Sequence, residues 1–289
     1  MFIWGSMRAL DGEQTSSGPL LAGFLQRCVE AGCTGVDLAD IYNQGRSETL
    51  IGEAFGHARE LADRLPLIAK AGVVFATPEA ALPAHHYRND AAHLRSALDS
   101  SLRRLGVEQV QTFLVHRPDY LMRFDETARA LEEMVHAGKV QKLGVSNFSV
   151  SQLNGLQGAL AAPLGHHQLE FSVLETSALE DGRLDAALTA GHRVTAWSPL
   201  AGGRLFSQND ATAARVREAL GELARESDAD GLAGAALAWI TRHPAGPVPI
   251  LGGTDIERIE RQCAALKATD FTPQSWYAVL EASRGKPVP

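Results

Sequence analysis

Cysteine and basic charge are both scarce in this sequence, and each shortage excludes a class of protein. Only three of the 289 residues are cysteine, Cys28, Cys33 and Cys263. They lack the even number of a disulfide framework and the Cys-x-x-Cys spacing of a zinc site, so no metal is expected. Lys and Arg number 27 against 34 Asp and Glu. Without a basic excess to bind phosphate backbones, nucleic acid is not an expected partner.

Long apolar segments are also missing. No run of about 18 apolar residues occurs, and the first residues lack a basic region followed by a short apolar stretch. We therefore expect no membrane contact and no export, with a reducing cytoplasm as the location. The 45% of hydrophobic residues is enough for a sizeable core, which predicts a soluble globular protein.

Short apolar runs alternate with longer segments of helical periodicity, which is the pattern of repeated βα units. The expected strands are 2–4, 34–38, 66–70, 110–116, 140–146, 165–170, 193–197 and 247–251. The expected helices are 18–31, 46–61, 90–105, 124–137, 149–161, 181–190, 211–227, 231–243, 255–268 and 273–284, with Ser149 and Asp255 as caps. The length suits one large domain over 1–289, although two compact domains are an alternative.

The first expected strand is not followed by Gly-x-Gly-x-x-Gly, so a doubly wound dinucleotide fold loses its main support. The pattern favours a closed (β/α)8 barrel, whose chemistry lies where the strands end and the βα loops begin. Polar residues at the strand ends are therefore the candidates for function. The longer connections 72–89 and 198–210 are candidate lids.

Four complementary side chains fall at the ends of three consecutive strands. Asp37 and Tyr42 follow the second expected strand, Lys70 closes the third and His116 the fourth. An ammonium about 4 Å from a phenol attracts its phenolate by about 4 kcal/mol, or about three pKa units. That attraction predicts a pKa near neutrality for Tyr42, with Asp37 as counter-charge to Lys70 and His116 directing a substrate oxygen.

Each of these residues taken singly also has an ordinary structural interpretation. Asp37 could cap a loop, Tyr42 could be half-buried, Lys70 could be solvated and His116 could fill the core. Taken together, they indicate proton transfer. A barrel isomerase or aldolase using Lys70 as a Schiff base is a further possibility.

Later strand ends carry amide and hydroxyl groups. Ser146, Asn147 and Gln168 suit a carboxamide, and Trp197 offers a face for a heteroaromatic ring, although Ser146 could simply cap a helix. The stretch from Gly252 to Asp255 leads into a helix bearing Arg258, which forms either an anion site or an ordinary turn.

These motifs together resemble the aldo-keto reductase family over about residues 3–285. The matching elements are Asp37-Leu38-Ala39-Asp40-Ile41-Tyr42, Gly52-Glu53-Ala54, Lys70, Val115-His116-Arg117-Pro118 and Gly144-Val145-Ser146-Asn147-Phe148. The resemblance implies a (β/α)8 barrel that binds NADPH and transfers hydride to a small aldehyde or ketone. Tyr42 would be the proton donor, Asp37 and Lys70 its tuning pair, and His116 would orient the carbonyl.

The resemblance also implies a set of ligands for NADPH or NADP⁺. They are Ser6, Met7, Asp37, Ser146, Asn147, Gln168, Trp197, Ser198, Pro199, Leu200, Gly202, Arg204, Gly252, Thr254, Arg258 and Gln262. Trp197 stands where the family often has a stacking Tyr, and the loop from Ser198 to Arg204 would cross the pyrophosphate. Arg258 and Gln262 match positions that contact the adenosine 2′-phosphate and the adenine.

The chain departs from the family pattern at three places. Gly252 and Gly253 replace a basic residue and a Ser, so NADH is an open alternative to NADPH. Gln262 replaces a common Asn. The first strand begins at residue 2, so we expect the N-terminal hairpin that usually plugs the barrel to be short or absent.

Substrate identity is the least determined property. We expect Trp4, Tyr87, Arg117 and the segment around Trp276 to frame the substrate pocket. A nucleotide-sensing binding subunit with little turnover is the alternative function, because some relatives of this barrel resemble potassium-channel β subunits. A monomer or weak oligomer is expected.

Overall fold

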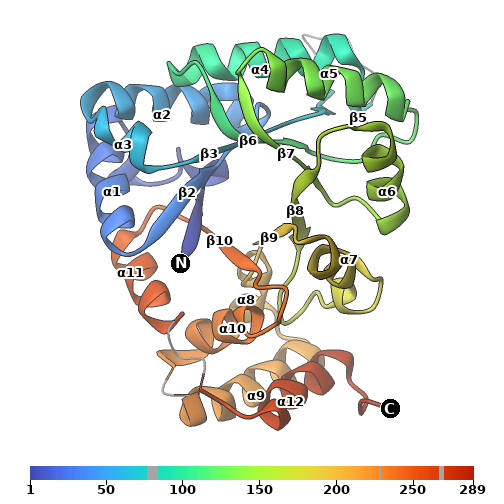
Figure 1. Cartoon of the computed structure of the whole chain (residues 1–289). Helices are drawn as coiled ribbons and strands as arrows, with labels where there is room; N and C mark the ends of the chain where they lie inside the picture. The colour runs from blue at the N-terminus through green and yellow to red at the C-terminus, as the bar shows by residue number, and fades with distance from the viewer. Residues whose placement is uncertain (77–83, 228, 267–269) are drawn as a thin grey trace.

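The computed structural model describes residues 1–76, 84–227, 229–266 and 270–289 of the chain. Eight parallel strands close a barrel in the order β1, β10, β9, β8, β7, β6, β3, β2, which confirms the predicted (β/α)8 fold (Figure 1). The barrel strands are β1 (Phe2–Gly5), β2 (Cys33–Asp37), β3 (Leu67–Ala71), β6 (Val110–Val115), β7 (Val140–Ser146), β8 (Leu164–Glu170), β9 (Arg193–Trp197) and β10 (Val248–Gly252).

The helices surround this barrel (Figure 1). They are α1 (Gly18–Glu30), α2 (Arg46–His57), α3 (Glu60–Arg64), α4 (Ala91–Leu105), α5 (Phe124–His136), α6 (Val150–Ala159), α7 (Arg183–Ala190), α8 (Arg204–Ser207), α9 (Ala211–Ser227), α10 (Gly231–Thr241), α11 (Ile256–Ala265) and α12 (Pro273–Arg284). The predicted caps are observed: Ser149 accepts from the backbone N–H of Gln152 before α6, and Asp255 from that of Arg258 before α11.

One helix and two connections differ from the expected pattern. The expected helix 46–61 is divided into α2 and α3, because Ala58 leaves the helical conformation. The connection 72–89 contains a short antiparallel pair, β4 (Val73–Val74) and β5 (His86–Tyr87), and its residues 77–83 lie outside the described part. The connection 198–210 contains the 3₁₀ turn η5 (Ala201–Gly203) and α8.

The apolar core has an inner and an outer part. Inside the barrel, Ile3, Ile68, Leu114 and Ile250 form a small buried cluster. Two larger clusters lie between the strands and the surrounding helices. The strands are thus covered on both faces, as expected for a parallel barrel, and their ends are held rigidly at the rim.

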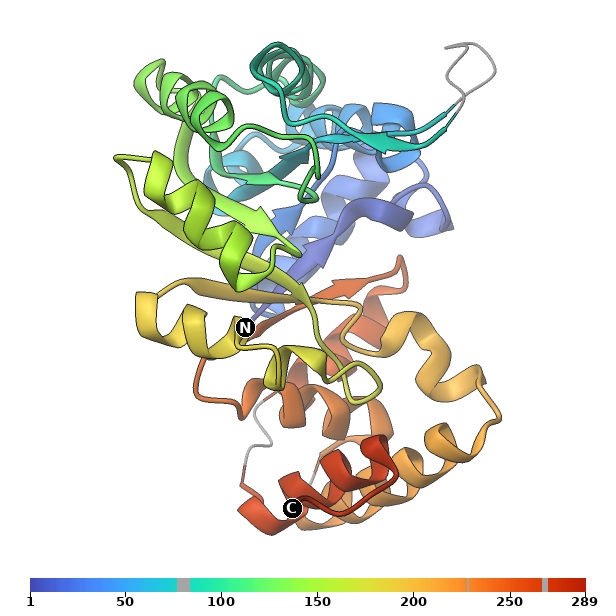
Figure 2. The same ribbon diagram turned by 90° about the vertical axis from the view of Figure 1, so that its right-hand side faces the viewer.

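Trp276 anchors α12 instead of framing the substrate pocket, so that expectation is wrong. Its ring stacks on Trp239 of α10 with centroids 4.7 Å apart, and each indole N–H donates to the other residue's backbone carbonyl. Figure 2 shows α12 beside α9, at the opposite end of the molecule from α4 and α5. Within the described residues, no helix is long and apolar enough to cross a membrane.

Two glycines test the packing of this fold in opposite directions. A Cβ on Gly144 of β7 would overlap the backbone carbonyl oxygen of His166, whereas a Cβ on Gly23 of α1 would meet nothing within 4 Å. Gly144→Ala should therefore lower the free energy of unfolding by about 1–3 kcal/mol. Gly23→Ala should raise it by about 0.5–1 kcal/mol, because Ala favours a helix over Gly. Urea denaturation measures both, and equal effects would contradict the assigned barrel packing.

Candidate active site

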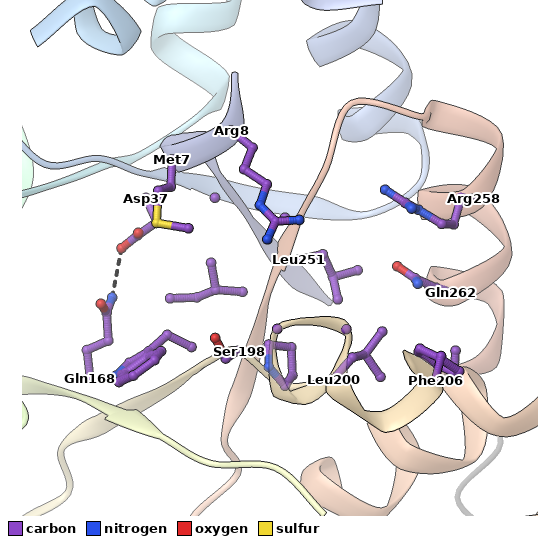
Figure 3. Close-up of a pocket in the computed structure, with 18 of the residues that line it drawn as sticks. Met7, Arg8, Asp37, Gln168, Ser198, Leu200, Phe206, Leu251, Arg258 and Gln262 are labelled. Atoms are coloured by element: carbon purple, nitrogen blue, oxygen red, sulfur yellow. Dashed lines mark hydrogen bonds between the residues drawn. The ribbon is translucent and has the colours of Figure 1, made fainter. Parts of the chain in front are cut away.

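A cavity of about 810 Å³ opens where the strands end. Figure 3 shows Asp37 and Gln168 at one end and Arg258 and Gln262 at the other. The lining residues predicted from the sequence are Met7, Asp37, Tyr42, His116, Arg117, Ser146, Gln168, Trp197, Ser198, Pro199, Leu200, Gly202, Gly252, Arg258 and Gln262. The tertiary structure thus brings most of the expected residues to one elongated cavity.

A buried ion pair forms the base of one end. Lys70 Nζ donates to Asp37 Oδ2 at 2.7 Å and to the backbone carbonyl of Leu38 at 2.5 Å. Gln168 Nε2 donates to the other carboxylate oxygen of Asp37 at 2.7 Å. Burial acts to lower the pKa of Lys70, but the attraction of Asp37 and Tyr42 prevails and raises it. Lys70 is therefore a fixed cation behind the cavity wall.

Tyr42 lies beside this cation on a short 3₁₀ turn, η3 (Tyr42–Gly45), just after β2. The Nζ atom of Lys70 is 5.0 Å from the centroid of its ring. Burial nevertheless outweighs the nearby ammonium, so the pKa of Tyr42 is raised above its ordinary value. The expected pKa near neutrality is therefore wrong, because desolvation of the phenolate outweighs the attraction of Lys70. Tyr42 keeps its proton at neutral pH.

His116 faces Tyr42 edge to face, with ring centroids 6.1 Å apart. Burial, together with the charges of Lys70 and Arg117, holds its pKa well below the usual value of 6.5. Its Nδ1 atom is buried and has no hydrogen-bond partner among the described residues. A neutral imidazole and a protonated phenol thus stand together at the cavity, and both can donate a hydrogen bond.

The next strand ends hold an aromatic ring in place. The indole N–H of Trp197 donates to Asn147 Oδ1 at 2.9 Å, and Asn147 Nδ2 donates to Ser146 Oγ at 2.7 Å. The guanidinium of Arg117 lies over the Trp197 ring, 5.3 Å from its centroid. Trp197 and Ser146 line the cavity, while Asn147 fixes their positions from behind.

The loop after β9 follows the cavity towards its other end. Ser198, Ala201, Gly202 and Gly203 all have positive φ, which lets the chain turn tightly along the wall. Arg204 does not line the cavity. Its Nε donates to the carbonyl of Ala201 at 3.1 Å, and its guanidinium lies 3.9 Å from Glu170, so it supports the loop.

Two cations from α11, Arg258 and Arg261, line the far end. Arg258 packs over Gly253, whose φ is +114°, and a Cβ on Gly253 would overlap the guanidinium. Glycine at this position therefore makes room for Arg258. A Cβ on Gly252 would meet nothing within 4 Å, so this position is open space and carries no basic side chain.

Several expected ligands lie outside the cavity lining. Trp4 is fully buried and donates to the carbonyl of Gly253 at 3.0 Å, and Ser6 donates to the carbonyl of Asp37 at 2.9 Å. Thr254 packs against Gly12. Tyr87 is 37% exposed on β5 and does not line the cavity. Trp4 and Ser6 thus support the site through the backbone, and the idea that Trp4 touches a substrate is wrong.

Sequence reasoning also missed residues that line the cavity. They are Gly5, Arg8, Ile41, Gly203, Phe206, Asp230, Gly231, Leu232, Ala233, Ile250, Leu251 and Arg261. Arg8 follows a strand end, and Arg261 lies three residues after Arg258 on one helix face, so both carried a usable signal. Asp230 precedes α10, and residues 231–233 form its first turn; nothing in their sequence indicated a site.

A second acid, Asp40, precedes Tyr42 by two residues in the sequence. Asp40 has one carboxylate oxygen buried without a hydrogen-bond partner among the described residues. Burial, with the nearby carboxylate of Glu48, raises its pKa to about 7. Glu48 is itself fully buried and pairs with Arg104.

In the described part of the chain, no group of three His, Cys, Asp or Glu could hold a metal ion.

The comparisons with known proteins agree with one another. A sequence model of the aldo/keto reductase family matches residues 2–284. A 6-dehydroglucose reductase of Novosphingobium aromaticivorans is 37% identical, covering 99% of this chain and 92% of its own length. One of Agrobacterium fabrum is 35% identical, covering 99% and 95%. The solved structure of a glycerol dehydrogenase from Gluconobacter oxydans superposes with a TM-score of 0.80 at 22% identity, covering 99% and 92%.

Asp40→Asn should stabilise the protein more at high pH than at low pH. The folded-state pKa of about 7 exceeds the ordinary 3.8, so ionised Asp40 destabilises the fold increasingly between these values and fully above them. We expect Tm to rise by several degrees at pH 8 and by less at pH 5. The exposed Asp63→Asn serves as control. A larger gain at pH 5 would contradict the assignment.

Proposed function

This chain belongs to the aldo/keto reductase family, and we propose that it reduces an aldehyde to an alcohol with NADPH. The observation that carries the proposal is the buried pair of Lys70 and Asp37 beside Tyr42, whose hydroxyl remains protonated at neutral pH. As part of the proposal the chain acts as a monomer or weak oligomer in the cytoplasm. Its three buried free thiols suit that reducing compartment.

The residues present fit a nicotinamide dinucleotide. The cavity is elongated and holds about 810 Å³, within the range of known cofactor sites. Ser146 and the side-chain amide oxygen of Gln168 suit the carboxamide of a nicotinamide, and Trp197 offers a flat face to the nicotinamide ring. At the opposite end, Arg258 and Arg261 suit an adenosine phosphate.

The proposed mechanism uses two uncharged groups, Tyr42 as the proton donor and His116 as a hydrogen-bond donor. When bound, the reduced nicotinamide would supply a hydride to the carbonyl carbon. Tyr42 donates its hydroxyl proton to the carbonyl oxygen, and the fixed ammonium of Lys70 stabilises the phenolate that remains. Asp37 keeps Lys70 charged and in place. The neutral imidazole of His116 orients the same oxygen by a hydrogen bond.

Schiff-base chemistry at Lys70 is not supported by this geometry. Lys70 is 1% exposed, is bonded to Asp37 and Leu38, and does not line the cavity. A Schiff base requires a free amine. Because the pKa of Lys70 is raised, its side chain stays a charged ammonium instead.

We further propose that the substrate is a polar, hydroxyl-bearing aldehyde such as a sugar aldehyde. Two relatives with more than a third of residues identical are named 6-dehydroglucose reductases. The reaction end also carries the guanidinium of Arg117 beside His116, both of which can donate to substrate oxygens. Tyr87 lies close enough to Arg117 to act on its pKa, and it can contact a larger substrate at the rim.

Tyr42→Phe tests the proposed proton donor. It removes the hydroxyl but keeps the ring beside Lys70, so turnover of a sugar aldehyde with NADPH should fall at least about 100-fold. NADPH binding, measured by fluorescence titration, should change by less than about 2-fold. A Phe variant as active as the parent would sink the mechanism. Binding of NADPH by the parent without turnover of any aldehyde would instead favour a nucleotide-sensing subunit.

Arg258→Met tests the phosphate end. The loss of charge-assisted hydrogen bonds should weaken NADPH binding about 10-fold or more, while NADH binding changes little because it lacks the 2′-phosphate. Arg59→Met, an exposed arginine of the same charge outside the cavity, is the matched control. Equal losses for NADPH and NADH would reject Arg258 as a 2′-phosphate ligand.

A further inference from the structure

Asn89 is a fully buried amide that lies outside the cavity lining. It belongs to the connection between β5 and α4 and directly precedes Asp90, the N-cap of α4. Removing an amide from water is costly unless hydrogen bonds within the protein replace those made with water. The partners of Asn89 therefore show which part of the structure this residue holds in place.

The side chain of Asn89 is bonded to the loop that follows β6. Its Nδ2 atom donates to the backbone carbonyl of Arg117 at 2.9 Å and to Met122 Sδ at 3.5 Å. The backbone N–H of Asn89 donates to Asp119 Oδ2 at 3.3 Å, and Asp119 Oδ1 accepts from the N–H of Leu121 at 2.8 Å. One buried residue thus ties this loop down at several points.

Asn89 is itself held from two sides. Its backbone carbonyl accepts from the hydroxyl of Thr127 on α5 at 2.9 Å. On another side lies Gly72, just after β3, where φ is +115° and a Cβ would overlap Asn89 Oδ1. The missing side chain at Gly72 therefore makes room for the amide. These contacts fix the direction in which Asn89 presents its donor.

Arg117 is the residue of this loop that reaches the reaction end. It lines the cavity, and its guanidinium lies over the ring of Trp197. A long side chain loses rotamer freedom when it binds a ligand, and a fixed backbone lowers that cost. The hydrogen bond from Asn89 to the carbonyl of Arg117 supplies such a fixed point.

We propose that Asn89 is a positioning residue that sets the preference for hydroxyl-bearing aldehydes by holding Arg117 at the reaction end. The inference rests on the proposed function, which assigns Arg117 to the substrate oxygens. The bond between Asn89 and Arg117 is the same before and during the reaction. Its loss should therefore raise KM for a hydroxylated substrate and leave kcat nearly unchanged.

Asn89→Leu tests this role, because Leu keeps the approximate shape of the side chain and removes the donor. Asn89→Ser, whose hydroxyl is too short to reach the carbonyl of Arg117, is a second variant with the same loss. Glyceraldehyde and propanal are the probes, since they share one carbon chain and only glyceraldehyde carries hydroxyl groups. Steady-state kinetics with NADPH give kcat and KM for each aldehyde.

The other variants are Arg117→Met, the double variant Asn89→Leu/Arg117→Met and the matched control Thr127→Val. The control removes a hydrogen bond to Asn89 but none to Arg117. Thermal melts check that each variant is folded.

Asn89→Leu and Asn89→Ser should raise KM for glyceraldehyde about 3- to 10-fold and KM for propanal less than about 2-fold, with similar kcat. Arg117→Met should show the same split with a larger loss. The double variant should match Arg117→Met, because Asn89 acts through Arg117. Thr127→Val should lower Tm without changing the preference between the two aldehydes.

Four results would overturn the inference while the proposed function stands. They are an unchanged KM for glyceraldehyde in the Asn89 variants, equal losses for both aldehydes, a Thr127→Val variant with the same split, and additive losses in the double variant. An unchanged KM for glyceraldehyde in Arg117→Met would also reject it, by removing Arg117 from the substrate site. A parent protein that reduces neither aldehyde would instead contradict the proposed function, and this inference with it.

Discussion

The carboxylate of Asp37 and the ammonium of Lys70 are buried together at one end of the cavity, and the rest of the site depends on this pair. Either charge alone would cost several kcal/mol to bury. They meet at 2.7 Å, and the amide of Gln168 and the carbonyl of Leu38 satisfy their remaining positions. These groups follow or lie on β2, β3 and β8, so the network exists only when the barrel is closed.

Tyr42 and His116 acquire their chemical states from the same burial. Removal from water disfavours the charged form of each group, which raises the pKa of the phenol and lowers that of the imidazole. Both therefore carry a donor hydrogen while uncharged. The buried positive charge beside Tyr42, Lys70, stabilises the phenolate only when Tyr42 gives up its proton. The rigid strand ends hold Lys70, Tyr42 and His116 in fixed positions relative to one another.

The two ends of the cavity use different physical means. The reaction end relies on buried, fully paired groups that fix directions. The other end is lined by two arginines from α11 and by the loop after β9, whose residues 201–203 have positive φ. Gly253 ties this end to the core, because its carbonyl accepts from the indole of the buried Trp4 and its missing side chain leaves space for Arg258.

Periodicity and strand-end polarity in the sequence determined the eight strands, the caps at Ser149 and Asp255 and the grouping of Asp37, Tyr42, Lys70 and His116, because these signals are local or follow from one topological rule. Only the tertiary structure decided which side chains reach the cavity. Trp4 and Trp276 pack against other parts of the fold instead of contacting the cavity, and Asn147 stands behind Trp197. Side-chain direction depends on neighbours that are distant in the sequence. The raised pKa of Tyr42 likewise required the closed fold, since desolvation is a property of the surroundings and not of the residue.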